Sequence, residues 1–280
     1  MPYRRWGWQF AGVRMRRRIA TRDLLDIAGP ADDVTLRPYA AADLDAVVAV
    51  HDALTLTEHA GLVCRSRWLQ RALQPDPDEA EIAHVALRDG RIVGLLLLAK
   101  AAPSGGHGSY DVDVLRLFGE DRAVERALWR TIAHHHTTAP RTTFVSRPAD
   151  PLLFELRHGL EVSGVTTEHF MTRLIAAPAA IAARGWPLVS VTVDLEIVDP
   201  QRPANAGRFV LEVEGRAGAL TPGGSGRVVI DIGVLSSLYT GFVTANELAH
   251  AGRLPGATAA DLDALTAAFT APAPFLRDFF

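Results

Sequence analysis

The last nine residues carry the first candidate for chemistry. They read Pro272-Ala-Pro-Phe-Leu-Arg-Asp-Phe279-Phe280, an apolar and aromatic end where most chains are polar and frayed. Each proline fixes its own φ and restricts the residue before it. Burial of this tail would place the α-carboxylate of Phe280 in apolar surroundings, raise its pKa and prepare it to act as a general base. Taken alone, the tail favours a simpler alternative, a plug that seals a core or an oligomer contact.

Three consecutive histidines, His134, His135 and His136, are the second candidate. Adjacent residues of a helix point about 100° apart, so three in a row cannot all face one metal ion. No carboxylate or thiol at ligand spacing accompanies them. Histidine at a helix C-terminus, where it interacts favourably with the helix dipole, explains the run better. We therefore expect no metal site.

Two glycine-rich stretches resemble phosphate-binding loops only loosely. They are Gly105-Gly-His-Gly108 and Gly223-Gly-Ser-Gly226, and neither opens a helix after a strand with a lysine at P-loop spacing. We interpret both as turns. The sequence contains no Gly-x-Ser-x-Gly elbow and no His-Glu-x-x-His, so nothing in it indicates a hydrolase.

The composition is that of an ordinary globular protein. The chain has 280 residues, 48% hydrophobic and 22% charged, which suits two globular domains. A net charge of -3 and a pI near 6.4 give no reason to expect nucleic acid or an anionic membrane as a partner. The single Cys64 excludes an intrachain disulfide. Without a signal peptide or an apolar run of about 18 residues, we expect a soluble, cytoplasmic protein.

Hydrophobic periodicity in the first half predicts a mixed α/β domain. Asp89-Gly90 between two apolar runs is a strong hairpin signal, and Asp150-Pro151 predicts the start of a short helix. We expect helices at 41–57, 66–73 and 120–134, and strands at 13–19, 34–38, 82–87, 92–99, 110–117 and 142–145.

The pattern changes near residue 165. Strands come first and helices follow, which is an α+β arrangement and indicates a separate domain. We expect strands at 166–175, 189–198, 209–213, 219–221 and 228–232, and helices at 178–183, 234–238, 244–251 and 258–269.

The element order of the first half resembles the GNAT acetyltransferase fold, in which acetyl-CoA sits where two central strands splay apart. That fold binds the CoA pyrophosphate with a loop of the form Arg/Gln-x-x-Gly-x-Gly/Ala at a helix N-terminus. The corresponding stretch here is Arg116-Leu-Phe-Gly119-Glu120-Asp121. Its two carboxylates would satisfy the free amides of the helix and repel phosphate. We predict a GNAT-like domain without cofactor-binding residues.

Two further stretches carry a more specific resemblance. Tyr3-Arg4-Arg5-Trp6-Gly7-Trp8 resembles the Tyr-x-Arg-aromatic-Gly-aromatic motif of the enhanced intracellular survival (Eis) family of acetyltransferases. Asn205-Ala-Gly207-Arg208-Phe209, the stretch 235–241 and the aromatic C-terminus resemble the sterol-carrier-protein-like domain of that family. The resemblance covers essentially the whole chain. It implies a degenerate second GNAT domain at 31–163 and a sterol-carrier-protein-like domain at 164–280.

The resemblance also implies a reaction. Members of the family transfer acetyl from acetyl-CoA to an amine, an aminoglycoside or a similar polyamine, and we expect a homo-oligomer. By match to the motif, Tyr3 is the general acid that protonates the departing CoA thiolate. The Phe280 carboxylate is the general base that deprotonates the amine.

One departure from the family is large. A complete CoA-binding GNAT domain precedes the tyrosine motif in the family, whereas almost nothing precedes Tyr3 here. We expect residues 1–30 to be the remnant of that first domain, through a misassigned start, a fragment or gene loss, and this chain alone to bind acetyl-CoA poorly. The rival hypothesis is a non-catalytic module that binds a lipid or hydrophobic ligand, or serves assembly, through the second domain.

Overall fold

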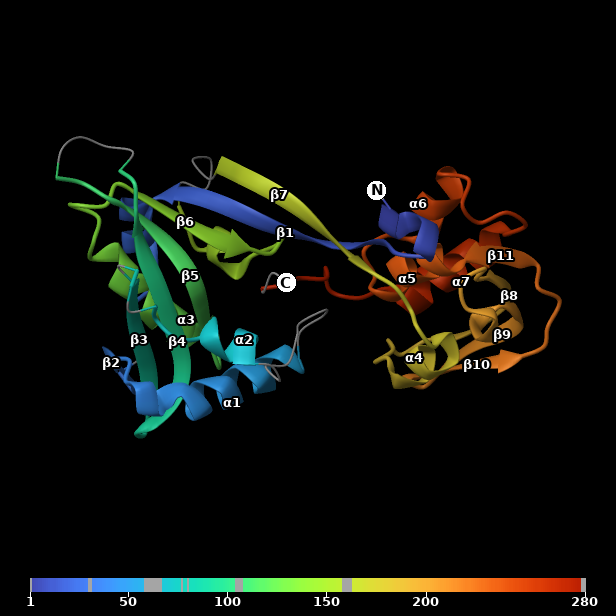
Figure 1. Ribbon diagram of the computed structural model, residues 1–280, viewed down its shortest axis with the longest axis horizontal. Coiled ribbons are helices and arrows are strands. Elements are labelled where there is room, and N and C mark those ends of the chain that lie inside the picture. The colour runs from blue at the N-terminus through green and yellow to red at the C-terminus, as the bar shows by residue number, and fades with distance from the viewer. Residues whose placement is uncertain are drawn as a thin grey trace. The chain divides into compact units, whose positions relative to one another are not determined.

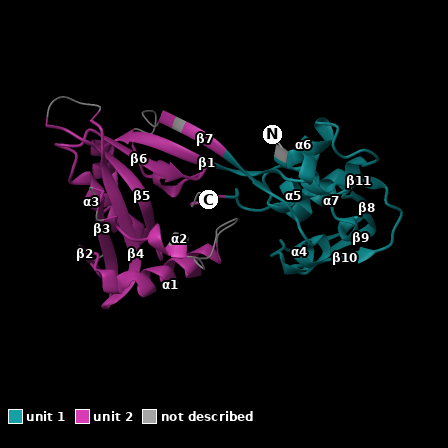
Figure 2. Ribbon diagram, viewed as in Figure 1, with its two compact units in different colours: residues 1–13, 169–274 teal, residues 14–168, 275–280 magenta. Residues whose placement is uncertain are grey.

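The computed structural model describes residues 2–29, 32–57, 67–76, 78–79, 81–103, 108–157 and 163–277. They form two compact units (Figure 2). Unit 1 contains residues 1–13 and 169–274, and unit 2 contains residues 14–168 and 275–280. The units therefore group the two ends of the chain differently from the predicted domains at 1–30, 31–163 and 164–280, and those boundaries stay a prediction.

A seven-stranded sheet is the frame of unit 2, and its order is β2-β3-β4-β5-β6-β1-β7 (Figure 1). Neighbouring strands run antiparallel from β2 to β5 and between β6 and β1, whereas β5 and β6 run parallel. The strands are β1 (Gln9–Ala20), β2 (Val34–Pro38), β3 (Glu81–Arg88), β4 (Arg91–Ala101), β5 (Asp111–Gly119), β6 (Arg141–Ser146) and β7 (Ser163–Thr172).

Helices cover both faces of this sheet. Residues of α3 (Arg122–Ala133) pack on Val93, Leu96 and Leu98 of β4 in one apolar cluster, and Val47 of α1 (Leu44–Thr55) packs near Leu95 in another. Burial on two faces explains why β4 reads as a nearly continuous apolar run. A short helix, α2 (Arg67–Arg71), follows α1.

The predicted hairpin at Asp89-Gly90 is confirmed. Strands β3 and β4 pair antiparallel across it, and the φ angles of Asp89 and Gly90 are 51° and 76°. Positive φ at both central residues is the geometry of a type I′ turn, which matches the twist of the flanking strands. The predicted order of strand, two helices, three antiparallel strands, helix and strand is confirmed as well.

Unit 1 contains a four-stranded sheet with the order β10-β9-β8-β11. Its strands are β8 (Ser190–Val198), β9 (Gly207–Glu214), β10 (Ala217–Pro222) and β11 (Val228–Asp231), and β8 and β11 are parallel. Helices α4 (Ala177–Ala183), α5 (Ile232–Tyr239), α6 (Ala245–His250) and α7 (Ala259–Phe269) bury one apolar cluster with this sheet. The predicted strands-then-helices pattern is therefore confirmed.

One strand has a different partner from the one its position in the sequence suggested. The strand predicted at 166–175 forms as β7, but it is the neighbour of β1 in the larger sheet. Alternating hydrophobicity specifies that a segment is extended, whereas the pairing partner depends on long-range contacts. Among the described residues, none of the helices has the length and apolar character needed to cross a bilayer.

Candidate functional site

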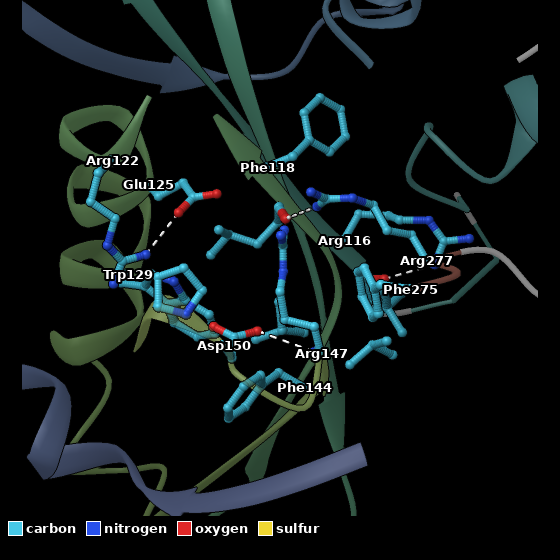
Figure 3. A pocket seen from close by; sticks show the side chains of 15 residues that line it. Arg116, Phe118, Arg122, Glu125, Trp129, Phe144, Arg147, Asp150, Phe275 and Arg277 are labelled. Carbon is cyan, nitrogen blue, oxygen red and sulfur yellow. Dashed lines mark hydrogen bonds and ion pairs between the residues drawn. The ribbon is translucent and has the colours of Figure 1, made fainter. Parts of the chain in front are cut away.

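A pocket in unit 2 opens where strands β5 and β6 part. Their parallel register joins Val112 to Thr142 and ends at Val114 and Phe144, while β5 continues to Gly119 paired with β4. Strand β5 has a β-bulge at Leu115. Leu98 of β4 pairs with Val114 and the adjacent Leu97 pairs with Arg116, so Leu115 between them has no partner on β4. The lining is formed by β5, α3, β6, the segment directly after β6 and the C-terminal tail (Figure 3). Its residues include Leu115, Arg116, Phe118, Arg122, Glu125, Trp129, Phe144, Arg147, Asp150, Phe275 and Arg277.

The C-terminal tail occupies part of this opening. Phe275 and Leu276 are buried, and the guanidinium of Arg277 donates to the carbonyl of Leu117 on β5 at 3.0 Å. The guanidinium of Arg147 lies 5.4 Å from the centre of the Phe275 ring. The remaining cavity volume is about 50 Å³, which is space for a few water molecules and far below the roughly 300 Å³ of a small ligand site.

Ion pairs join Arg122 of the pocket lining to glutamates on and beyond α3. Arg122 contacts Glu125 at 2.7 Å and Glu155 at 2.6 Å, and Arg126 also reaches Glu155. Burial alone would lower the pKa of Arg122, but the two glutamates outweigh it and raise that pKa. Burial likewise opposes ionisation of Glu155, and Arg126 and Arg122 nevertheless hold its pKa below the usual range. These ion pairs order the side of the pocket formed by α3.

The N-terminus of α3 is closed by carboxylates. Asp121 is the N-cap and accepts from the amide of Val124 at 3.0 Å, and it pairs with Arg88 at 2.7 Å. The hydrogen bond from Arg88 and the amide of Val124 lower the pKa of Asp121. The adjacent Glu120 pairs with Arg91. A pyrophosphate would have to displace Asp121 and face two negative charges.

Acetyl-CoA therefore does not fit this opening. The helix N-terminus that would hold its pyrophosphate is capped by Asp121, and the space between β5 and β6 contains residues of the tail. Phe280, the predicted general base, lies outside the described residues. The described part of the tail ends at Arg277, so the structure shows the approach of the tail to β5 and no position for its carboxylate.

Tyr3, the predicted general acid, lies in unit 1 on a 3-10 turn, η1 (Pro2–Trp6). Its side chain is 55% exposed, and its ring meets those of Trp6 and Trp8 edge to face, with 6.3 Å between centroids in each pair. The amide of Trp8 donates to the carbonyl of Tyr3 at 3.3 Å. The phenol is thus presented on an ordered aromatic turn and remains accessible.

The distant contacts of the aromatic turn and of the start of β1 could not be predicted from the sequence. Hydroxyls of Ser237 and Thr240, at the end of α5 and directly after it, donate to the carbonyls of Phe10 and Ala11. Arg173, which follows β7, donates to the carbonyl of Trp6. More than 160 residues of sequence separate these partners, and no local pattern indicates such contacts.

The histidine run is divided among different partners. Nδ1 of His135 lies 2.7 Å from the hydroxyl of Tyr110, and Nδ1 of His136 lies 2.9 Å from the carbonyl of Ala133. Burial, with help from nearby Lys100, lowers the pKa of His135. Within the described ranges, no three His, Cys, Asp or Glu side chains are grouped so as to hold a metal ion.

Comparison with known proteins addresses both halves of the chain. Residues 61–174 match the acetyltransferase (GNAT) domain family, and residues 177–277 match the sterol carrier protein domain family. The N-acetyltransferase Eis of Mycobacterium tuberculosis is 31% identical over 210 residues, covering 66% of this chain and 50% of that protein. The chain therefore spans about half the length of the curated relatives it matches.

Solved structures share the fold of nearly the whole chain. A GCN5-related N-acetyltransferase from Anabaena variabilis has a TM-score of 0.88 at 23% identity, covering 99% of this chain and 70% of its own. One from Kribbella flavida has a TM-score of 0.82 at 29% identity, covering 99% of this chain and 67% of its own. These matches confirm the predicted fold class, and the chain is a homologue of the Eis N-acetyltransferases, with a GNAT domain followed by a sterol carrier protein domain.

Proposed function

We propose that this chain takes part in the transfer of an acetyl group from acetyl-CoA to a small-molecule amine. The observation that carries the proposal is the similarity to Eis across both domains, joined to a tyrosine motif whose phenol is ordered and exposed. An aminoglycoside or a similar polyamine is the substrate class, and the protein acts in the cytoplasm as a homo-oligomer.

The proposed chemistry uses one acid and one base. The amine reacts in its neutral form, and the Phe280 carboxylate takes one proton from its nitrogen as that nitrogen attacks the thioester carbonyl, which leaves one hydrogen on the amide nitrogen. The new amide C–N bond forms as the C–S bond breaks, and Tyr3 donates its proton to the departing thiolate. Exposure of the Tyr3 side chain leaves room for a thioester beside it.

Acetyl-CoA binding is the first test of this proposal. Because Asp121 caps α3 and the tail lines the opening between β5 and β6, we expect the 280-residue chain by itself to give no saturable heat with acetyl-CoA in titration calorimetry. A saturable isotherm would contradict the prediction that this chain has no pyrophosphate site.

The acid and the base are tested in the natural gene product, by its acetyl-CoA-dependent acetylation of amines. We expect Tyr3→Phe to lower kcat about a hundredfold, the usual contribution of a general acid. Deleting Phe280 moves the terminal carboxylate back by one residue, and adding one glycine moves it forward. Both changes should lower kcat. Wild-type rates in all three variants would contradict the proposal and favour the lipid-binding or assembly alternative, which native mass spectrometry tests through co-purifying lipid.

A further inference from the structure

The backbone of the turn that carries Tyr3 is bound by a side chain from a distant part of unit 1. Nη1 of Arg173 donates to the carbonyl of Trp6 at 2.5 Å. Trp6 lies at the end of η1, and its ring is one of the two that the Tyr3 ring contacts. A hydrogen bond from a charged donor is stronger than one from a neutral donor. This one fixes the backbone at the end of the turn.

Arg173 is itself held rigidly. Its Nη2 donates to both carboxylate oxygens of Asp199 at 2.9 Å, and only 7% of its side chain and none of the Asp199 side chain is exposed. Burial opposes ionisation of Asp199, but hydrogen bonds from Asn205 and Arg173 lower its pKa, so the carboxylate stays charged. Arg173, Asp199 and Asn205 form what we call the Arg173 network.

Asn205 connects this network to the sterol carrier protein domain. Its Nδ2 donates to Asp199 at 3.0 Å and to the carbonyl of Ile175 at 3.1 Å, and its Oδ1 accepts from the amide of Ala177 at 2.9 Å. Asn205 is 1% exposed. A buried amide with all of these bonds satisfied is fixed in one orientation, so the position of Arg173 is set by the carrier domain.

Gly7 shows how closely the motif and Arg173 are fitted. Its φ is +79°, and a Cβ built on it would lie 1.7 Å from Nη1 of Arg173 and 2.7 Å from Ile232. A side chain at this position would therefore displace the arginine as well as strain the backbone. The positive φ and the nearness of Arg173 therefore explain why the tyrosine motif has glycine at position 7, and neither can be seen in the sequence.

We propose that Arg173 is a positioning residue for Tyr3: by binding the Trp6 carbonyl, the Arg173 network orders the turn on which the phenol is presented. The chemical consequence rests on the proposed role of Tyr3, whereas the ordering of the turn does not. The sterol carrier protein domain thereby acquires a task in acetyl transfer that requires no lipid.

The ordering is tested by tryptic cleavage after Arg4 and Arg5, which lie in η1. We expect Arg173→Met in the full chain to accelerate this cleavage at least about tenfold, the effect of one lost charged hydrogen bond. Arg227→Met is the matched control. Arg227 also pairs with a buried aspartate of unit 1, Asp261, at 2.5 Å, and lies on another part of the domain. Equal acceleration in both variants, or none in Arg173→Met, would overturn the proposal.

The catalytic consequence is tested in the natural gene product with a double-mutant cycle. Arg173→Lys keeps the positive charge but loses the planar guanidinium that donates to both Asp199 and Trp6. We expect it to lower kcat more than it raises KM. In a Tyr3→Phe background the same change should have almost no further effect. Additive losses would show that Arg173 acts on stability alone and overturn the positioning role. If Tyr3→Phe leaves kcat unchanged while Arg173→Met still accelerates cleavage, the proposed function fails and the ordering of the turn stands.

Discussion

Arg184 shows how unit 1 accommodates a charge in its core. It is 7% exposed, and its guanidinium donates to the carbonyls of Tyr239 and Phe269, the last residues of α5 and α7. The rings of Trp186 and Phe269 lie 4.6 Å and 5.3 Å from it. Burial lowers its pKa, and the negative ends of two helix dipoles together with aromatic faces stabilise the guanidinium charge.

Asp261 gives unit 1 a predictable dependence on acid. The side chain is buried, and its ion pair with Arg227, together with hydrogen bonds from Thr258, lowers its pKa from 3.8 to about 2. A carboxylate whose pKa falls on folding stabilises the protein above its unfolded pKa and loses that contribution as pH falls through its folded pKa. We therefore expect the urea midpoint of unit 1 to fall steeply between pH 4 and pH 2.

Substitution at this position isolates the effect. Asp261→Asn should lower the midpoint at neutral pH and flatten its decline in acid, as measured by tryptophan fluorescence during urea unfolding. Asp263→Asn, on the exposed side of the same helix, controls for the change in net charge. A wild-type pH profile in Asp261→Asn would contradict the assignment.

At the scale of elements, α3 illustrates how one capping residue decides what a helix can bind. The side chain of Asp121 accepts a hydrogen bond from the amide of Val124 and pairs with Arg88 at the end of β3. The same amides would otherwise be free to bind an anion. A GNAT domain that uses its own carboxylate here gains helix stability and gives up a pyrophosphate site.

We expect Asp121→Ala to destabilise unit 2 by about 1 kcal/mol, the usual cost of losing an N-cap. Asp121→Asn retains a capping oxygen and should recover most of that loss. Hydrogen exchange of the α3 amides, measured by mass spectrometry, reports the change locally. Glu120→Ala is the matched control: its ion pair with Arg91 is exposed on both sides, so its removal should have little effect.

At the scale of the molecule, each end of the chain belongs to a different unit from the segment next to it in the sequence. Residues 1–13 belong to the unit with 169–274, and residues 275–277 belong to the unit with 14–168 (Figure 2). Strands β1 and β7, neighbours in one sheet, each contain residues of both units. The contacts of both ends are therefore long-range in the sequence, and contacts of this kind slow folding.

The tail tests this arrangement. Phe275→Ala should destabilise unit 2 by roughly 3 kcal/mol, as for other buried phenylalanines, although residue 275 follows α7 of unit 1 in the sequence. Hydrogen exchange should therefore increase in β5 and β6 and stay unchanged in α7. Phe154→Ala is the control, since Phe154 is in unit 2 and 80% exposed. Increased exchange in α7 in place of β5 would contradict the assignment of the tail.

Much of this protein follows from local sequence. The strands at 34–38, 82–87 and 92–99 and the helix at 120–134 formed within about two residues of their predicted ends, because side-chain period and turn chemistry act over a few residues. The hairpin at Asp89-Gly90 and the carboxylate cap of α3 were visible for the same reason. The tyrosine motif and the carrier domain were identifiable from short stretches of residues.

The tertiary structure alone decided which distant segments meet. Arg173 is an ordinary arginine in the sequence, and its role depends on partners from two other segments, Trp6 and the loop with Asp199 and Asn205. Likewise, β7 pairs with β1 rather than with the sheet that follows it, and Phe275 lines an opening between β5 and β6. These contacts pair charges and bury apolar side chains from segments far apart in the sequence, and no single stretch of sequence contains both partners.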